Sequence, residues 1–399
     1  MTSTSRGLVP GLATTETVSW GILYYAFPVL LPAMERDLGW SRTTLIGAYT
    51  VAVIVSGLAA LPVGRLLDRR PSRSLMTAGS ILAALSVLGW AAASSVGAFY
   101  VTWVAIGAAM ALVLYEPAQV VLVKQFGANA TRAITTLTLV AGFASTIFQP
   151  VTAILADRLG WRSALVVLGV VLAAVTIPLH LIVLPGRVVR PTPTTTTVRD
   201  VSRPRRDPTV TLLTVAFTLA MATMAAGIVH LIPYLVDHGW SPVLAAIAAG
   251  TLGATQVAAR VAFGPTARRT SASHLAAGIL GLPAVAIVVL ALSDGSWMAW
   301  IAVALLGAAQ GTATLLRPML LSRLNGPDGY GRLAATSAAT TTIARATAPL
   351  ALAALAVAVG YGIALALFAA ASVAAAVLAV RALSPRPHPR DTEYSLSHS

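Results

Sequence analysis

Long apolar runs separated by short polar turns extend through most of the chain. A helix needs about 20 apolar residues to cross a bilayer, and a sustained run of that length predicts a transmembrane helix. Twelve such runs are predicted, at residues 10–32, 43–63, 74–93, 98–122, 133–156, 163–184, 210–235, 242–263, 274–292, 298–321, 334–357 and 361–380. The pattern therefore predicts an all-α membrane protein with twelve transmembrane helices.

A single long polar stretch, residues 185–209, interrupts this pattern. Its content of Pro, Thr and Arg is typical of a flexible linker. The chain is accordingly predicted to form a six-helix bundle over 1–184, a linker over 185–209, a second six-helix bundle over 210–383 and a polar tail over 384–399.

The two halves repeat each other at an offset of about 200 residues. The chain has DLGWS at 37–41 and DHGWS at 237–241, and GAAMALVLYEP at 107–117 matches GAAQGTATLLRP at 307–318 with one insertion. This predicts two pseudo-symmetric bundles related by an axis along the membrane normal. In each GWS corner, Gly would allow the tight turn, Trp would anchor at the membrane interface and Ser would cap the next helix.

The amino-acid composition is typical of a membrane protein and excludes any chemistry that depends on cysteine. Hydrophobic residues make up 57% of the chain and charged residues 10%, whereas a soluble domain carries about 25% charged residues. With no cysteine, disulfides, thiol catalysis and iron–sulfur clusters are excluded. The N-terminal run has no small-residue cleavage site, which indicates a retained first helix and not a signal peptide.

The net charge of +14 is distributed in a way that predicts topology. If the N-terminus is inside, twenty of the 27 Lys and Arg residues fall on the cytoplasmic side, and four, Arg36, Arg42, Arg158 and Arg162, fall outside. This asymmetry predicts cytoplasmic termini and a cytoplasmic linker. Basic loops of this kind contact anionic lipid and do not indicate a nucleic-acid partner. The bias toward Ala, Arg and Gly favours a bacterial inner membrane.

The sequence lacks the motifs of the common membrane enzymes and ATP-driven pumps. It has one lysine, Lys124, and no phosphate-binding loop with Gly-Lys-Ser/Thr, no His-Glu-x-x-His and no Gly-x-Ser-x-Gly. We therefore expect a protein that is not an enzyme and that carries no metal or cofactor. Nothing in the sequence indicates an oligomer, and a monomer is expected.

The loop after the second predicted helix, GRLLDRRPSR at 64–73, resembles the loop signature of the major facilitator superfamily. The resemblance implies that fold, with two six-helix halves. It also implies that Gly64 permits close helix contact, and that Asp68 and Arg69 form ion pairs which hold one state of a cytoplasmic gate. The second-half copy, GPTARR at 264–269, has Arg268 where Asp68 stands, so its gating pairs must differ.

Two further motifs resemble the monocarboxylate-transporter-like branch of that superfamily. YYAFPVLLPAMERDLGWSRT at 24–43 is similar to its first helix, and QVAAR at 256–260 is similar to its eighth-helix motif. The second resemblance implies that Arg260 binds the substrate carboxylate. Animal members have Lys and Asp where this chain has Val29 and Gln256, so their route of proton coupling is not implied.

Five ionisable residues lie within predicted spans: Glu16, Glu116, Arg260, Arg317 and Arg345. Each costs about 2.5–3.5 kcal/mol to insert and is by default a hypothesis of function. Their charges sum to +1, which a bound anion would neutralise. Arg345 lies ~21 Å into its helix and is interpreted as a substrate or coupling group, or as part of a structural pair. Arg260 either binds substrate or reaches the cytoplasmic surface.

The two acidic residues have distinct predicted roles. Glu116 and Arg317 precede prolines at equivalent points of the repeat, which predicts a gate pair made in the outward-facing state and broken in the inward-facing state. Alternatively each pairs within its own half, or Glu116 carries protons. Glu16 is predicted to couple protons, because burial favours a neutral carboxyl that can load and unload, or to make a structural hydrogen bond.

Several neutral polar residues complete the predicted site. His230 could titrate near neutral pH or serve as a hydrogen-bonded packing residue. Tyr24 and Tyr25 are candidate substrate-binding hydroxyls, one facing the cavity and the other packing. Glutamines within the spans are candidates to line the same path or to bridge helices; these are Gln149, Gln256 and Gln310.

These observations predict a secondary active transporter that moves a small organic anion, a carboxylate, by alternating access, with proton cotransport as an option. A drug or secondary-metabolite exporter of the same fold is the alternative, since few charges line the path. A non-transporting membrane sensor is a third hypothesis that no feature of the sequence supports directly.

Overall fold

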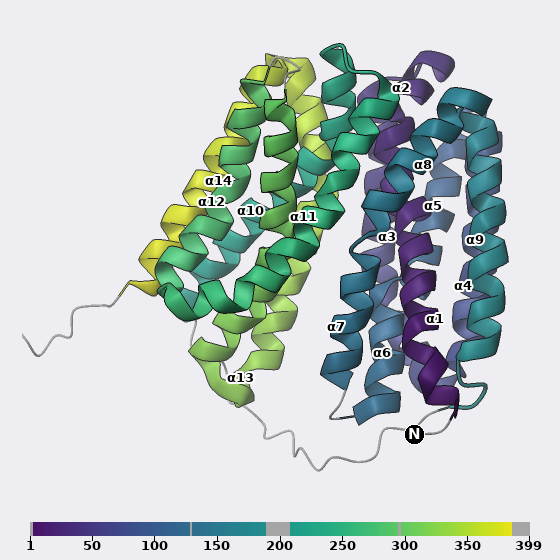
Figure 1. Ribbon diagram of the computed structural model, residues 1–399, viewed down its shortest axis with the longest axis horizontal. Coiled ribbons are helices and arrows are strands. Elements are labelled where there is room, and N and C mark those ends of the chain that lie inside the picture. The colour runs from purple at the N-terminus through teal and green to yellow at the C-terminus, as the bar shows by residue number, and fades with distance from the viewer. Residues whose placement is uncertain (1–2, 128–129, 189–207, 294–296, 385–399) are drawn as a thin grey trace, which may run out of the picture.

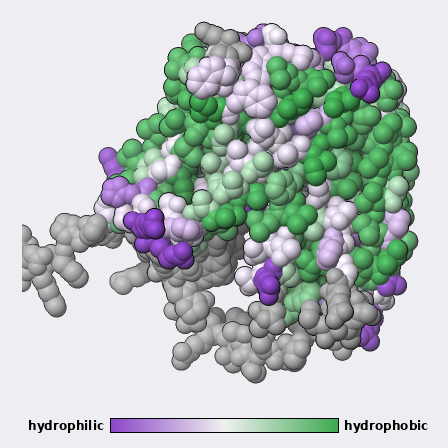
Figure 2. All heavy atoms as spheres, in the orientation of Figure 1, coloured by the Kyte–Doolittle hydropathy of each residue, from purple (hydrophilic) through white to green (hydrophobic). Residues whose placement is uncertain are grey.

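The computed structural model describes residues 3–127, 130–188, 208–293 and 297–384, and within them all regular structure is helical. Twelve of its helical segments are long and apolar enough to cross a membrane. Figure 2 shows hydrophobic atoms over the flanks of the molecule and hydrophilic residues gathered toward its ends. The predicted all-α membrane fold with twelve spans is confirmed.

The helices of the first half are α1 (Ser3–Trp20), the π-helix η1 (Gly21–Tyr25), α2 (Ala26–Leu38), α3 (Arg42–Arg69), α4 (Ser72–Ala92), α5 (Val96–Val113), α6 (Tyr115–Phe126), α7 (Ala130–Ala141), α8 (Ala144–Leu159) and α9 (Trp161–Val183). Those of the second half are α10 (Pro208–Asp237), α11 (Pro242–Arg269), α12 (Ala272–Ala291), α13 (Met298–Val359) and α14 (Tyr361–Leu383). The tenth and eleventh candidate spans both belong to α13.

Both GWS corners fold as the sequence predicts. Gly39 and Gly239 adopt φ values of 67° and 87°, in the left-handed region that glycine occupies without a steric penalty. Ser41 and Ser241 then cap α3 and α11, because each hydroxyl accepts a hydrogen bond from the backbone N–H three residues further on. The repeat in sequence is therefore a repeat in backbone geometry.

The corner tryptophans pack onto neighbouring helices. The Trp40 ring lies 5.5 Å from that of Phe99, and the Trp240 ring lies 6.1 Å from that of Trp300. Trp240 is buried, with 9% of its surface exposed. Their main contacts are thus within each half, where aromatic pairs add to the stability of the turn.

Proline removes a backbone hydrogen bond from a helix, and two spans are irregular near a proline. The π-helix η1 ends three residues before Pro28. In the fourth span, α5 ends at Val113 and α6 begins at Tyr115, because Pro117 has no N–H to bond the carbonyl of residue 113. In the fifth span, α8 continues through Pro150.

The fifth span is instead interrupted at residues 142–143, where α11 crosses it closely. A Cβ on Gly253 would lie only 2.5 Å from Thr146 Oγ1 and 2.6 Å from the carbonyl oxygen of Gly142. The Thr146 hydroxyl donates to the carbonyl oxygen of Gly250 at 2.8 Å. Small residues let the backbones approach here, and the break in helix 5 lies at this crossing.

The two ends of the helical bundle are named here by the turns that they carry. The corner face is the end with the turns at 38–42 and 237–242. The linker face is the opposite end, with the turns at 69–72 and 269–272 and the helix ends at 183 and 208. In Figure 1 the N-terminus lies at the linker face and the two sets of helices approach each other toward the corner face.

Contacts between the halves concentrate toward the corner face. There α8 packs on α11, α3 on α13 and α2 on α10. At the linker face, α6 and α7 make no extended contact with second-half helices in the described part of the chain. The molecule is therefore closed at the corner face and separated at the linker face.

Candidate functional site

The middle of the first membrane span is built around an irregular turn. The π-helix η1 contains Tyr24 and Tyr25, and π-helical turns occur often at functional sites. At Gly21 the Phe148 ring of α8 packs so closely that no Cβ would fit. Both tyrosines are 9% exposed, and the Tyr24 hydroxyl interacts with that of Tyr49 on α3.

Two arginines from the second half face these tyrosines. Arg260 on α11 and Arg345 on α13 both lie close enough to Tyr25 for their charges to act on its hydroxyl. Arg345 acts in the same way on Tyr49, and Arg260 on Tyr115. The structure thus brings together residues that lie more than 200 positions apart in the chain.

The two arginines differ in how they are held. Arg260 Nη1 donates to the carbonyl oxygen of Thr138, 3.1 Å away on α7, which is a contact between the halves. Arg345 makes no hydrogen bond or ion pair in the described part of the chain. Both side chains are partly buried. A half-buried guanidinium without an acidic partner is costly, so this position favours a bound anion.

Glu16 lies on α1 one turn before the π-helix and is completely buried. Neither carboxyl oxygen has a hydrogen-bond partner in the structure. The indole N–H of Trp20 interacts weakly with the carboxyl group but does not reach hydrogen-bond geometry. An ionised carboxylate in such a place is costly, so the neutral acid is the form that this environment accommodates.

Glu116 stands at the start of α6 and is exposed. It lies close enough to Glu16 for the two carboxyl groups to repel when both are charged. The first half therefore contributes the acids and the second half contributes Arg260 and Arg345, and no ion pair joins these four in the described chain.

His230 is 1% exposed, and both of its ring nitrogens are engaged within the second half. Nδ1 is hydrogen-bonded to the Tyr361 hydroxyl on α14, and Nε2 lies 2.9 Å from the carbonyl oxygen of Pro349 on α13. A neutral ring satisfies both bonds if Nε2 donates and Nδ1 accepts. This arrangement ties three helices together, which matches the packing interpretation of His230.

The three candidate glutamines differ in burial. Gln149 is 2% exposed and its Oε1 has no partner, and Gln256 is 5% exposed. Gln310 is partly exposed. The backbone of Gln256 is pressed against Gly311, where a Cβ would not fit. Gln149 lies on α8, which packs against η1, so its buried and unpartnered Oε1 is close to the irregular turn of the first span.

The loop signature at the linker face forms an ion pair through Asp68. Asp68 pairs with Lys124 on α6 at 2.8 Å, within the first half. Arg69 is exposed and has no acidic partner among the described residues. A Cβ on Gly64 would meet nothing within 4 Å, so the close helix contact expected there is absent from this conformation. Separation of the halves at the linker face accounts for this difference.

Glu116 and Arg317 are apart in this structure. Glu116 makes no ion pair with a described residue, whereas Arg317 Nη1 donates to Thr341 Oγ1 at 3.3 Å. The predicted gate pair belongs to a conformation closed at the linker face, which is not the one described. The pair therefore stays a prediction.

Exchange of the two charges tests this gate. Glu116→Arg and Arg317→Glu, each alone, are expected to reduce transport at least about fivefold, because like charges would meet when the linker face closes. The double variant Glu116→Arg/Arg317→Glu should regain part of that loss. Flux in proteoliposomes measures all three, and a double variant no better than the worse single one would contradict the pair.

Among the described residues, an ion pair between the halves lies at the corner face, and the sequence analysis missed it. Arg42 binds Glu35 of its own half through Nε and Nη2, at 2.9 and 2.8 Å, and Asp237 of the other half through Nη1 at 2.8 Å. The Arg42 and Glu35 side chains are each 20% exposed. Charge-assisted, two-pronged contacts of this kind are among the stronger hydrogen bonds.

The corresponding aspartate of the first corner is used differently. Asp37 accepts a hydrogen bond from Trp161 Nε1 at 3.0 Å and lies 3.6 Å from Arg162 Nε, both within its own half. The repeat therefore keeps the acid and changes its partner. The recurrence of Asp in both corners was a signal in the sequence for a role of these acids. The sequence could not show which residue each aspartate contacts.

This fold, two sets of six spans with a charged contact between them, is that of a polytopic membrane protein. Among the described residues no cluster of three His, Asp or Glu side chains could hold a metal ion. The chain belongs to the Major Facilitator Superfamily, whose family pattern matches residues 15–335.

Comparison with known proteins adds three similarities. The chain is 30% identical to human monocarboxylate transporter 11 over 306 residues, which cover 70% of this chain and 58% of that protein. It is 30% identical over 159 residues, 40% of this chain and 42% of the other, to an uncharacterized 38 kDa protein of Thermoproteus tenax. The chain thus spans about half the length of these curated relatives.

A solved structure has the same overall fold. It is a bacterial homologue of the human lysosomal transporter Spinster in an inward-facing, unoccupied conformation, with a TM-score of 0.73 and 15% identity over 96% of each chain. At this identity the match shows the fold alone.

Proposed function

We propose that this protein is a secondary active transporter that moves a small organic anion, a carboxylate, by alternating access. The observation that carries the proposal is the position of Arg345: it is half-buried, has no acidic partner in the described chain, and faces the Tyr25 hydroxyl of the opposite half. A substrate that neutralises Arg345 while contacting Tyr25 would bridge the two halves.

Carboxylate is the anion that fits these groups best. A guanidinium offers parallel N–H donors that match the two oxygens of a carboxylate, and tyrosine hydroxyls can donate to the same oxygens. Arg260 would be the second cation near the same hydroxyls. The similarity to a protein named as a monocarboxylate transporter supports this choice.

The conformation fits one step of such a cycle. We infer that the linker face is cytoplasmic, because most Lys and Arg residues lie on that side, and that the protein resides in a bacterial inner membrane. Closure at the corner face with separation at the linker face is then the inward-facing state. The segments 1–184 and 210–383 would move as two bodies joined by the linker.

Glu16 is proposed to carry a proton in this cycle. It is buried with both oxygens unpaired, so it is held as the neutral acid in the inward-facing state, and release of the proton requires solvent or a cation to reach it. Glu116 lies within electrostatic range and would favour retention of the proton while it is itself charged.

Replacement of Glu16 by glutamine, which mimics the neutral acid, tests the coupling. Glu16→Gln should exchange substrate at a rate within about twofold of the parent. Its uptake driven by a pH gradient should be lower than that of the parent by at least about tenfold. Exchange and gradient-driven uptake in the same proteoliposomes measure the two activities. Gradient-driven uptake that survives in this variant would remove Glu16 from the proton path.

The function itself is tested by counterflow in proteoliposomes with a panel of carboxylates at two pH values. Loading one carboxylate inside should accelerate entry of the same labelled carboxylate, since exchange needs no coupling ion. No acceleration by any carboxylate, with activity on uncharged or cationic compounds, would instead support the exporter hypothesis.

One observation favours that second hypothesis. The aromatic side chains of Trp20, Tyr24, Tyr25 and Tyr115 form a continuous group, with ring centroids 5.0–6.4 Å apart. Such a surface suits bulky flat compounds. Export of drugs or secondary metabolites is the function that it would serve if carboxylate exchange fails.

A further inference from the structure

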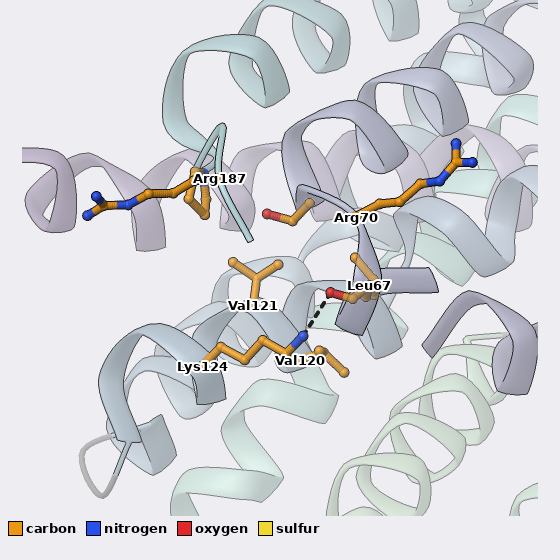
Figure 3. Close-up of a pocket in the computed structure, with 8 residues that line it drawn as sticks. Leu67, Arg70, Val120, Val121, Lys124 and Arg187 are labelled. Atoms are coloured by element: carbon orange, nitrogen blue, oxygen red, sulfur yellow. Dashed lines mark hydrogen bonds between the residues drawn. The ribbon is translucent and has the colours of Figure 1, made fainter. Parts of the chain in front are cut away.

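A pocket lies at the linker face of the first half, and neither Arg260 nor Arg345 lines it. It forms where the turn between α3 and α4 meets α6 and the chain leaving α9. Arg70, Ser72, Lys124 and Arg187 are among its lining residues and come from three separate stretches of the chain. Figure 3 shows this pocket with Leu67, Val120 and Val121 at its apolar side.

The charge around this pocket is positive and only partly neutralised. Lys124 Nζ is used by Asp68 and by the carbonyl oxygen of Leu67, both at 2.8 Å. Arg70 and Arg187 are exposed and have no acidic partner within 4.0 Å among the described residues. Figure 3 shows the two guanidinium groups extending away from the pocket to opposite sides.

The N-terminus of α4 opens into the same pocket without a cap. Pro71 occupies the N-cap position and no side chain accepts a hydrogen bond from the first turn, so the N–H groups there lack intrahelical acceptors. Ser72, the first helical residue, lines the pocket, is 9% exposed and has no hydrogen-bond partner among the described residues. An unpartnered hydroxyl and free amides at the positive end of a helix favour an anion.

Basic residues make this helix end more positive still. Arg73 lies in the first turn of α4, where a cation opposes the helix dipole, and its Nε donates to the carbonyl oxygen of Leu184 at 2.9 Å. At the equivalent point of the second half, Ser271 caps α12 by accepting from the N–H of His274. Only the first-half turn therefore combines free amides with surplus positive charge.

We propose that this pocket binds a phosphate group. The first-turn amides of α4 and the Ser72 hydroxyl would hold its oxygens, and Arg70 and Arg187 would neutralise its charge from either side. The group could belong to an anionic lipid headgroup at the membrane surface or to a soluble phosphate compound. Its binding would join the start of the linker to the turn between α3 and α4.

Binding to the purified full-length chain tests the site in two arms. Thermal stability is measured in detergent with added inorganic phosphate, and lipid retention is measured by native mass spectrometry after release from nanodiscs of phosphatidylglycerol or phosphatidylcholine. A midpoint raised by phosphate indicates a soluble ligand. Selective retention of phosphatidylglycerol without a phosphate effect indicates a lipid headgroup. No effect in either arm would overturn the proposal.

Matched variants place the effect in this pocket. Arg70→Gln/Arg187→Gln should weaken binding of the ligand that the test identifies at least tenfold. The control Arg268→Gln/Arg269→Gln, at the equivalent turn of the second half, should leave that binding unchanged. Equal losses in both variants would mean general attraction to basic loops and would overturn the site.

A second variant introduces a side chain that can cap the N-terminus of α4. Pro71→Asp places a carboxylate at the N-cap of α4, where it can accept from the free amides. Its melting midpoint should rise in the absence of ligand, and the ligand should then give no further increase. A Pro71→Asp chain that still binds phosphate or phosphatidylglycerol as the parent does would contradict the proposal even if the arginine variant proves unstable.

Discussion

Replacement of Arg345 by glutamine is expected to lower carboxylate counterflow by at least about 100-fold. Loss of two charge-assisted hydrogen bonds to a carboxylate costs about 3 kcal/mol, and each 1.4 kcal/mol is a factor of ten in affinity. Because Arg345 is the central arginine without a partner in the described chain, its removal creates no unpaired acid, and the protein should remain folded.

Three further variants complete this test. Arg345→Lys keeps the charge but loses the planar pair of donors, so an intermediate loss of about tenfold is expected. Arg381→Gln, in the exposed last turn of α14, removes an arginine far from the site and should leave counterflow within about twofold of the parent. Arg260→Gln should resemble Arg345→Gln. Unchanged flux in both the Arg260 and Arg345 variants would reject the anion site.

Replacement of Arg42 by glutamine is expected to open the corner face. The substitution leaves Glu35 and Asp237 facing each other across the two halves without the cation that joins them. Partly exposed, two-pronged pairs contribute about 1–2 kcal/mol, so the equilibrium should shift five- to thirty-fold toward a conformation open at this face. Spin labels on the two corners should report a longer distance in the variant.

The chain offers a matched control for this result. Arg162→Gln removes an arginine that serves Asp37 at the equivalent corner position, but within one half, and should leave the corner distance unchanged. A double-mutant cycle of Arg42→Gln with Asp237→Asn should give a coupling free energy of about 1 kcal/mol. A coupling near zero, or an equal response of the Arg162 variant, would mean that apolar packing alone closes this face.

Much of the fold and several residues of the candidate site could be predicted from the sequence. The apolar runs, the linker and the GWS repeat predicted the twelve spans and both capped corners, because helix length, glycine turns and serine caps depend on neighbouring residues. The same reasoning singled out Arg260, Arg345, Glu16 and Tyr25, because charges and hydroxyls within apolar spans are unusual wherever the helices lie.

The sequence by itself determined which segments cross the membrane, that they form two similar sets, and which polar groups lie within them, since these properties follow from local hydropathy and turn chemistry. Only the tertiary structure decided the partners. It paired Arg42 with Asp237 but left Asp37 within its own half, and it placed Lys124 on Asp68. Such choices depend on how helices distant in sequence tilt and pack, which no local pattern encodes.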